Sequence, residues 1–224
     1  YKPRDDEGIL KRYSDITQVD MSKGNWLVLS SANYFLDDAK DLCEIQGWYY
    51  QFKGRNSIPL KLLMALNNWE AWRKDAQLNH LEIKNIYEYL GSHVLPGFQK
   101  GKTLHSDTKY LMRDCRAEHG LVTDSVWYEA FEGLDNMTET YIRNMRANGE
   151  MINKNPRIIM STIHGAKGGE ADKVLLMQDI TNAALETFSH DPDELHRLFY
   201  TGATRAKREL HVLDPKDFDR AYIL

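Results

Sequence analysis

The chain has 224 residues, of which 42% are hydrophobic and 28% charged, and its 29 basic and 33 acidic side chains give a net charge of −4. Such a composition is typical of a soluble globular protein with a sizeable core. The net acidity excludes a polycation that coats duplex DNA, so any contact with nucleic acid must be local. No apolar stretch approaches the roughly twenty residues of a membrane span. Because Cys43 and Cys115 stand far apart, without metal-ligand spacing, we expect no metal site and a cytoplasmic location.

The first quarter of the chain contains a strand, a helix and a second strand. Residues 1–24 are polar and of mixed charge, which indicates a connector. An apolar strand is predicted over 26–29, a helix over 34–45 that ends at Gly47, and a second strand over 48–52. Two strands joined by a helix at this spacing form a parallel unit.

After residue 56 the pattern changes to successive helices, which predicts an insertion over 57–154. Helices are expected over residues 60–72, 81–90, 108–118, 125–131 and 137–148. Strand patterns return at 157–161, 173–177 and 209–213, and a helix begins at Asp191, the N-cap, with Pro192 in its first turn. We therefore predict an α/β fold: a parallel sheet flanked by helices, formed by 25–56 and 155–224 and interrupted by a mainly helical subdomain.

Chemically diverse side chains follow the strand at 157–161. The segment is Ser161-Thr162-Ile163-His164-Gly165-Ala166-Lys167-Gly168-Gly169-Glu170, with Val174 four positions on. It resembles T-x-H-x-x-K-G-x-E-x-x-x-V, motif V of the UvrD/Rep-type superfamily 1 helicases. Its glycines let backbone amides approach an anion, and the threonine hydroxyl can bind a phosphate oxygen. The alternative is a strand followed by a glycine turn whose polar side chains only satisfy the loop backbone.

A second segment, Arg197-Leu198-Phe199-Tyr200-Thr201-Gly202-Ala203-Thr204-Arg205-Ala206, resembles motif VI of the same family, R-L-x-Y-V-A-x-T-R-A. Thr201 and Gly202 stand where valine and alanine are commoner. Taken alone, the segment is also explained as a helix that ends in basic residues. In the family the second arginine of the motif reaches the γ-phosphate of the nucleotide, and Arg205 occupies its position. A guanidinium group suits that role through its permanent charge and forked donors.

Leu27 to Asn33 stands where the family carries motif IV, an apolar strand that runs into an Arg-Thr-Asn-like string. Asn33 fits this pattern, but Ser31 replaces the arginine, so one nucleotide contact of the family lacks its residue. The alternative is a strand followed by a serine-rich turn. The segment 97–103 resembles a phosphate-binding loop, yet its glycines enclose three residues instead of four and no apolar strand precedes it, so we interpret it as a basic loop.

Seven aromatic side chains of the insertion raise the possibility of stacking on bases. They are Trp69, Trp72, Tyr87, Tyr89, Trp127, Tyr128 and Phe131. Their helical spacing favours core packing instead.

The resemblance implies the C-terminal portion of a UvrD/Rep-like superfamily 1 DNA helicase, namely the second RecA-like domain with a helical insertion. It is specific over about 157–213, weaker over 25–56 and absent for the insertion. An N-terminal RecA-like domain of the same protein would carry the P-loop and make most of the contacts to ATP and Mg²⁺, so this chain alone would be inactive. Single-stranded DNA is the implied partner, with 3′→5′ movement.

The resemblance also implies a role for each matching residue. Arg205 would be catalytic; Glu170, Lys167, Gly168 and Arg205 would bind ATP; Thr162, His164 and Asn33 would bind DNA. A non-catalytic DNA- or protein-binding module derived from such a domain remains the alternative.

Overall fold

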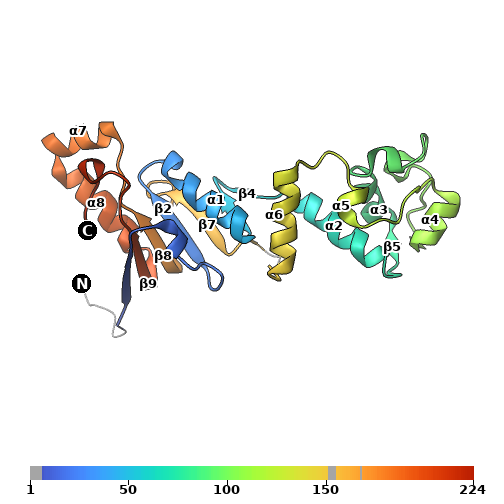
Figure 1. The fold of residues 1–224 in the computed structure, drawn as a ribbon, viewed down its shortest axis with the longest axis horizontal. Coiled ribbons are helices and arrows are strands. Elements are labelled where there is room, and N and C mark those ends of the chain that lie inside the picture. The colour runs from blue at the N-terminus through green and yellow to red at the C-terminus, as the bar shows by residue number, and fades with distance from the viewer. Residues whose placement is uncertain (1–6, 151–154, 167) are drawn as a thin grey trace. The chain divides into compact units, whose positions relative to one another are not determined.

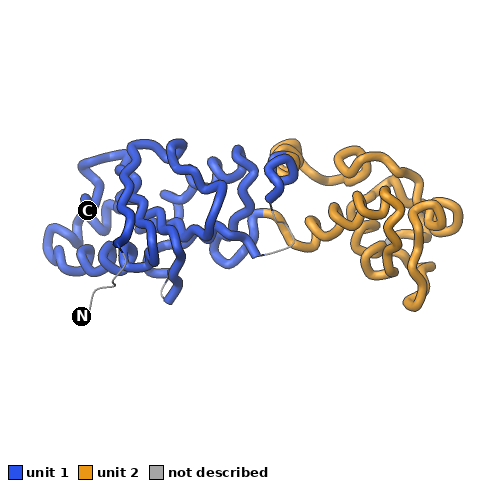
Figure 2. Tube along the Cα trace, turned by 90° about the horizontal axis from the view of Figure 1, so that it is seen from below, with its two compact units in different colours: residues 1–57, 144–224 blue, residues 58–143 orange. Residues whose placement is uncertain are grey.

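The computed structural model describes residues 7–150, 155–166 and 168–224, and its helices and strands are labelled in Figure 1. The chain divides into two compact units (Figure 2). Unit 1 consists of residues 1–57 and 144–224, and unit 2 of residues 58–143. Among the residues that the structure describes, no helix is both long enough and apolar enough to cross a membrane.

Unit 1 is built on a seven-stranded sheet with the order β1-β9-β8-β2-β7-β3-β4. The strands are β1 (Ile9–Tyr13), β2 (Trp26–Ser30), β3 (Tyr50–Phe52), β4 (Arg55–Asn56), β7 (Ile158–Thr162), β8 (Ala171–Met177) and β9 (Ala206–Leu213). All neighbours pair in parallel except β3 and β4, which form an antiparallel hairpin. Every residue of β2 is buried, as expected for a central strand of a parallel sheet covered on both faces.

The predicted parallel unit needs a correction in its strand order. β2 and β3 do run in parallel, but β7 lies between them, so that Met160 pairs with Val28 on one side and with Phe52 on the other. Sequence spacing alone does not show that a strand from later in the chain occupies this place.

Residues 9–13, assigned above to a connector, instead form β1 at the edge of the sheet. Leu10 lies opposite Leu210 of β9, and the ammonium group of Lys11 lies 3.7 Å from a carboxylate oxygen of Glu209. The charged side chains of this strand are exposed, which gives it the composition of a connector although its backbone pairs with β9.

Three helices lie wholly within the described part of unit 1. They are α1 (Asp37–Gln46), α7 (Asn182–His190) and α8 (Pro192–Ala203), and a 3-10 turn at Asn33–Leu36 precedes α1. As predicted, α1 ends at Gly47, which has a left-handed φ of 67°, and the Asp191 side chain caps α8. The helix α7 was not predicted; the hydroxyl of Thr181 caps its start by accepting the N–H of Ala184.

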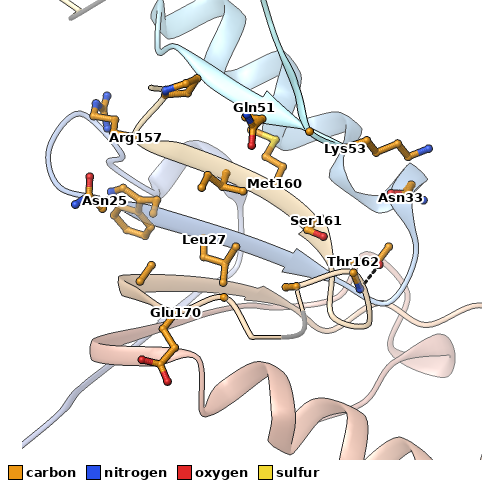
Figure 3. Close-up of a pocket in the computed structure, with 18 residues that line it drawn as sticks. Asn25, Leu27, Asn33, Gln51, Lys53, Arg157, Met160, Ser161, Thr162 and Glu170 are labelled. Atoms are coloured by element: carbon orange, nitrogen blue, oxygen red, sulfur yellow. Dashed lines mark hydrogen bonds between the residues drawn. The ribbon is translucent and has the colours of Figure 1, made fainter. Parts of the chain in front are cut away.

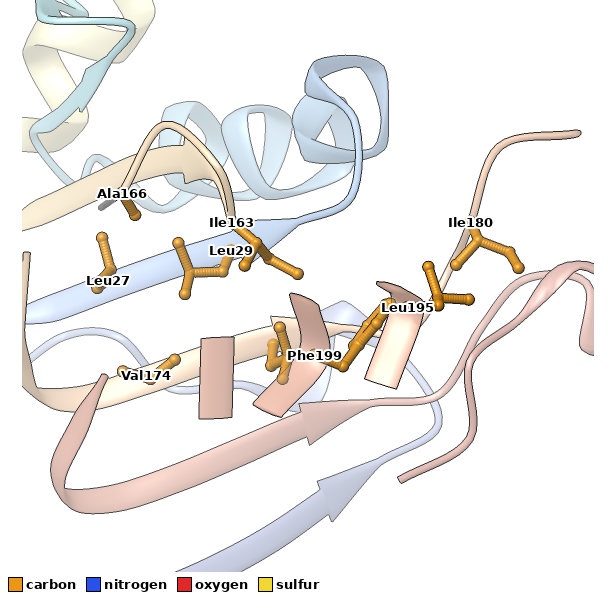
Figure 4. Packing of buried hydrophobic residues seen from close by; sticks show 9 residues of the cluster. Leu27, Leu29, Ile163, Ala166, Val174, Ile180, Leu195 and Phe199 are labelled. Atoms are coloured by element: carbon orange, nitrogen blue, oxygen red, sulfur yellow. The ribbon is translucent and has the colours of Figure 1, made fainter. Parts of the chain in front are cut away.

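The helix α8 packs on one face of the sheet through Leu195 and Phe199 (Figure 4). Every second residue of a strand contributes to this core, for example Leu27 and Leu29 on β2, because successive side chains of a strand point to opposite faces of the sheet. The turn after β7 contributes Ile163 to the same core, so the core also holds that turn in place.

A buried polar cluster connects β1 and β9. The imidazole of His211, 2% exposed, lies 3.0 Å from the hydroxyl of Tyr13 through Nδ1 and 3.1 Å from a carboxylate oxygen of Glu209 through Nε2. A carboxylate only accepts, so Nε2 donates to Glu209, and in the neutral ring Nδ1 then accepts from the Tyr13 hydroxyl. Burial lowers the pKa of His211 below its ordinary value, although Glu209 acts in the opposite direction.

Unit 2 is mainly helical. Its elements are α2 (Leu60–Trp72), β5 (Leu78–Asn79), α3 (His80–Tyr87), β6 (Lys109–Tyr110), α4 (Met112–Glu118), α5 (Trp127–Ala130) and the first part of α6 (Asn136–Ala147). The helix predicted over 108–118 begins only at Met112, because Lys109 and Tyr110 pair with β5 instead. The segment 97–103 contains a 3-10 turn at Gln99–Gly101.

The insertion is shorter than the predicted 57–154, because α6 continues into unit 1. There the side-chain amide of Asn144 donates to the carbonyl oxygen of Ile45, 3.0 Å away.

Core packing of the aromatic side chains is confirmed for five of the seven. Trp69, Trp72, Tyr87, Trp127 and Phe131 are all buried. The indole N–H groups of Trp69 and Trp72 donate to the carbonyl oxygens of Ser125 and Tyr110, at 3.1 and 3.0 Å.

Candidate functional site

The turn after β7 is fixed by its own backbone and by the core. The N–H of Ile163 donates to the carbonyl oxygen of Ser30 (2.9 Å) and the N–H of Ala166 to that of Thr162 (3.0 Å). Ile163 and Ala166 are buried in the core cluster, whereas His164 between them is exposed. Anchoring by these two apolar side chains therefore presents the polar residues of the segment to solvent.

A cavity of about 790 Å³ lies beside this turn in unit 1 (Figure 3). Asn33, Thr162 and Glu170, three of the predicted site residues, line it together with Ser161 and Gly165. The Thr162 hydroxyl oxygen accepts the N–H of Gly165 at 3.1 Å. The hydroxyl hydrogen is not used in that bond, so Thr162 can still donate to an anion.

The predicted nucleotide residues Glu170 and Arg205 lie on adjacent strand starts. The N–H of Ala171 donates to the carbonyl oxygen of Arg205 at 3.2 Å, which joins the first residue of β8 to the residue directly before β9. A carboxylate oxygen of Glu170 lies 3.6 Å from the ammonium nitrogen of Lys207, and both side chains are exposed.

The guanidinium group of Arg205 is partly buried at the end of α8. Its Nε atom is buried and has no hydrogen-bond partner among the described residues. Leaving a buried cationic donor unpaired is costly, but the Nε atom of Arg220 shares this feature, so the unpaired nitrogen by itself does not mark a ligand site.

Strand direction separates the predicted residues into two groups. Thr162 ends β7 and Asn33 follows β2, whereas Glu170 precedes β8 and Arg205 precedes β9. Because these strands are parallel, the first group lies at the carboxyl end of the sheet and the second at its amino end. A five-residue strand spans about 17 Å, so the two groups can serve different ligands.

His164 is not in the larger cavity. It lines a second one, of about 200 Å³, with Ser31, Thr181 and Glu194 among its neighbours. The hydroxyl of Ser31, which stands where the family has an arginine, donates to the carbonyl oxygen of Asp179 at 2.7 Å. The predicted site residue Gly168 has a φ of 86°, a backbone angle that glycine adopts without strain, and Lys167 lies outside the described residues.

Two cations on the larger cavity were not identified from the sequence. Arg157 precedes β7 and is neutralised, because its Nε lies 2.9 Å from a carboxylate oxygen of Glu150. Lys53 occupies the turn between β3 and β4. The Lys53-Gly54 pair between two short strands is a hairpin signal, but only the strand order shows that this hairpin lies beside β7.

Comparison with known proteins agrees with this arrangement. The sequence model of the UvrD-like helicase C-terminal domain family matches residues 100–214, just over half of the chain. No curated protein matches the chain. The matched region includes both motif segments, and it extends into unit 2, for which the motifs gave no resemblance. The mostly parallel sheet flanked by helices is that of a RecA-like fold. The chain belongs to the UvrD-like helicase C-terminal domain family.

Proposed function

We propose that this chain is the second motor domain of an ATP-dependent DNA helicase that moves 3′→5′ along single-stranded DNA. Arg205 completes an ATP site shared with an N-terminal RecA-like domain of the same protein. The observation that supports this most directly is the placement of two motif-derived groups at opposite ends of one parallel sheet: Asn33 and Thr162 at one end, Glu170 and Arg205 at the other.

Arg205 stands where the arginine of the family's motif VI reaches the nucleotide phosphate, and the residue is partly exposed. ATP supplies a γ-phosphoryl group whose oxygens gain charge during transfer, and a guanidinium group stabilises that charge. Glu170 holds an exposed carboxylate on the neighbouring strand start, suited to accept from ribose hydroxyls. Lys167 and Gly168 belong to the same nucleotide-facing segment in this proposal. In this proposal the Mg²⁺ ligands belong to the N-terminal domain.

The carboxyl-end group suits a DNA backbone. Thr162 offers a neutral hydroxyl and Asn33 a side-chain amide to one cavity, and His164 lies on the neighbouring turn. Neutral donors bind phosphates without reading bases, as a protein that moves along any sequence requires.

A non-catalytic binding module is the second candidate. It is favoured by Ser31, whose hydroxyl is engaged by a backbone carbonyl where the family has a nucleotide-binding arginine. Such a module keeps the DNA-facing residues and needs no arginine aimed at a phosphate.

ATP turnover separates the two candidates. The chain joined to its N-terminal motor domain is assayed with and without oligo(dT), and the 224-residue chain alone is the control. A helicase gives DNA-stimulated turnover by the joined protein and none by the chain alone. DNA binding without DNA-dependent turnover by the joined protein supports the module. Polarity is read from the arrival of the protein at a fluorophore on the 5′ or the 3′ end of the strand.

A further inference from the structure

Of the two cationic side chains that line the larger cavity in the described structure, Lys53 has no acidic partner. Arg157 is neutralised by Glu150, whose carboxylate contacts both Nε and Nη2 of the guanidinium group. Lys53 is exposed, and among the described residues no carboxylate lies within ion-pair distance of its ammonium group. The ammonium group lies 5.2 Å from the centroid of the Phe52 ring, a contact that leaves its charge without an anion. The positive charge of this cavity that no carboxylate balances therefore belongs to the β3–β4 hairpin.

Pairing register places Lys53 at the carboxyl end of the sheet, the end that we propose faces DNA. Phe52 pairs with Met160 of β7, so Lys53 follows at the level of Ser161, one residue before Thr162. Figure 3 shows Lys53 on the same side of the cavity as Asn33 and Thr162, and away from Glu170. The cation thus lies with the carboxyl-end group.

The backbone of Lys53 is unusual for its residue type. Phe52 and Arg55 pair across a two-residue turn in which Lys53 and Gly54 have φ values of 51° and 73°. Such a turn favours Asn-Gly, because positive φ is costly for residues with long side chains. Residues in sparsely populated backbone regions are concentrated at functional sites, where the side chain itself is needed.

We propose that Lys53 is a DNA-binding residue whose ammonium group contacts a backbone phosphate of the single strand also contacted by Asn33 and Thr162. The inference rests on the proposed function, because it assumes that this end of the sheet faces DNA. Lys53 supplies charge, whereas the other two supply neutral donors. Its contribution must therefore depend on salt, while theirs does not.

The test exploits the turn. Lys53→Asn gives the preferred Asn-Gly sequence while removing the cation, so we expect the variant to unfold at a higher temperature than wild type and yet bind DNA more weakly. With labelled oligo(dT) and fluorescence anisotropy at low salt, the affinity should fall about tenfold. The slope of log K against log salt should become shallower by about 0.7, the value for one phosphate contact on a single strand.

Two controls define the outcomes. Lys53→Arg keeps the charge and should retain the salt slope. Lys23→Asn removes an exposed lysine near the amino end of β2 and should bind like wild type. If Lys53→Asn binds with wild-type affinity and salt slope while Thr162→Val still weakens binding, the role of Lys53 is wrong and the proposed DNA-facing end is retained. If the wild-type chain does not bind oligo(dT) at all, the proposed DNA-facing end is wrong and this inference fails with it.

Discussion

The backbone N–H of Ala171 donates to the carbonyl oxygen of Arg205, and this 3.2 Å bond joins the starts of two neighbouring strands. One residue before Ala171 stands Glu170, so the carboxylate and the guanidinium group are held by the same pair of strands. Both residues lie directly before a strand, so the paired strand starts limit the movement of their backbones, as a shared nucleotide site requires.

We expect Arg205→Ala, in the protein that contains both motor domains, to lower DNA-stimulated ATP turnover by roughly 10³-fold or more, the scale of arginine fingers. Binding of single-stranded DNA should be nearly unchanged, since Arg205 lies at the other end of the strands. Arg205→Lys should restore little, because an ammonium group lacks the forked geometry. Arg208→Ala removes an exposed arginine from β9, the strand that follows Arg205, and is the matched control. Near wild-type turnover of Arg205→Ala would show that the motif at 197–206 is misassigned.

Thr162→Val keeps the side-chain shape and removes the hydroxyl. Affinity for single-stranded DNA should weaken by about 1 kcal/mol, the net value of one hydrogen bond, while nucleotide affinity without DNA stays constant. The Gly165 N–H released by this change is exposed and can bind water instead. Thr162→Ser retains the hydroxyl and serves as the control in an anisotropy titration.

Glu170→Gln should show the opposite pattern, with weaker nucleotide binding by calorimetry and unchanged DNA affinity. Its ion pair with Lys207 is exposed, so the substitution should cost at most about 1 kcal/mol of stability. Equal impairment of both ligands by Thr162→Val and Glu170→Gln would mean that the segment is only a structural turn.

Gly47→Ala should destabilise unit 1 more than Gly149→Ala does. Both glycines have nearly the same φ, 67° and 65°, so both substitutions carry the cost of a left-handed residue, about 1–2 kcal/mol. At Gly47 a Cβ would also lie 2.4 Å from the backbone carbonyl carbon of Asn144, whereas at Gly149 no described atom lies within 4 Å of it. Overlap with rigid backbone should add about 1–3 kcal/mol. Urea unfolding of the two variants gives the difference, and equal losses would contradict the close approach of α6.

Acid should destabilise the chain through His211. Its folded pKa is lowered by burial, so the unfolded chain binds a proton more tightly than the folded one. The stabilisation by the neutral ring is therefore complete above the unfolded pKa of about 6.5 and is lost as pH falls below it. Urea unfolding between pH 8 and pH 5 should show this decline, and His211→Gln, which does not titrate, should reduce it. An identical pH dependence for the variant would exclude His211 as its source.

Local signals in the sequence predicted many of the elements. The helix at 60–72, the stop at Gly47 and the cap at Asp191 all depend on residues within a few positions, and the structure has them where predicted. The two motif segments likewise sufficed to name the family.

Non-local pairing could not be predicted in the same way. The edge strand β1 pairs with residues two hundred positions later, through Leu10 and Leu210, and its own composition gives no sign of this. His164 is turned toward a separate cavity because Ile163 and Ala166 are buried on either side of it. Lys53 becomes part of the candidate site only because β7 lies next to β3.

The place of β7 between β2 and β3 has a consequence for synthesis on the ribosome. β2 is apolar and pairs with β7 and β8, both of which are translated after the whole of unit 2. Until then β2 has none of its native neighbours, and its unpaired edges must stay protected from other chains. The nascent sheet can therefore be completed only after the helical insertion has left the exit tunnel.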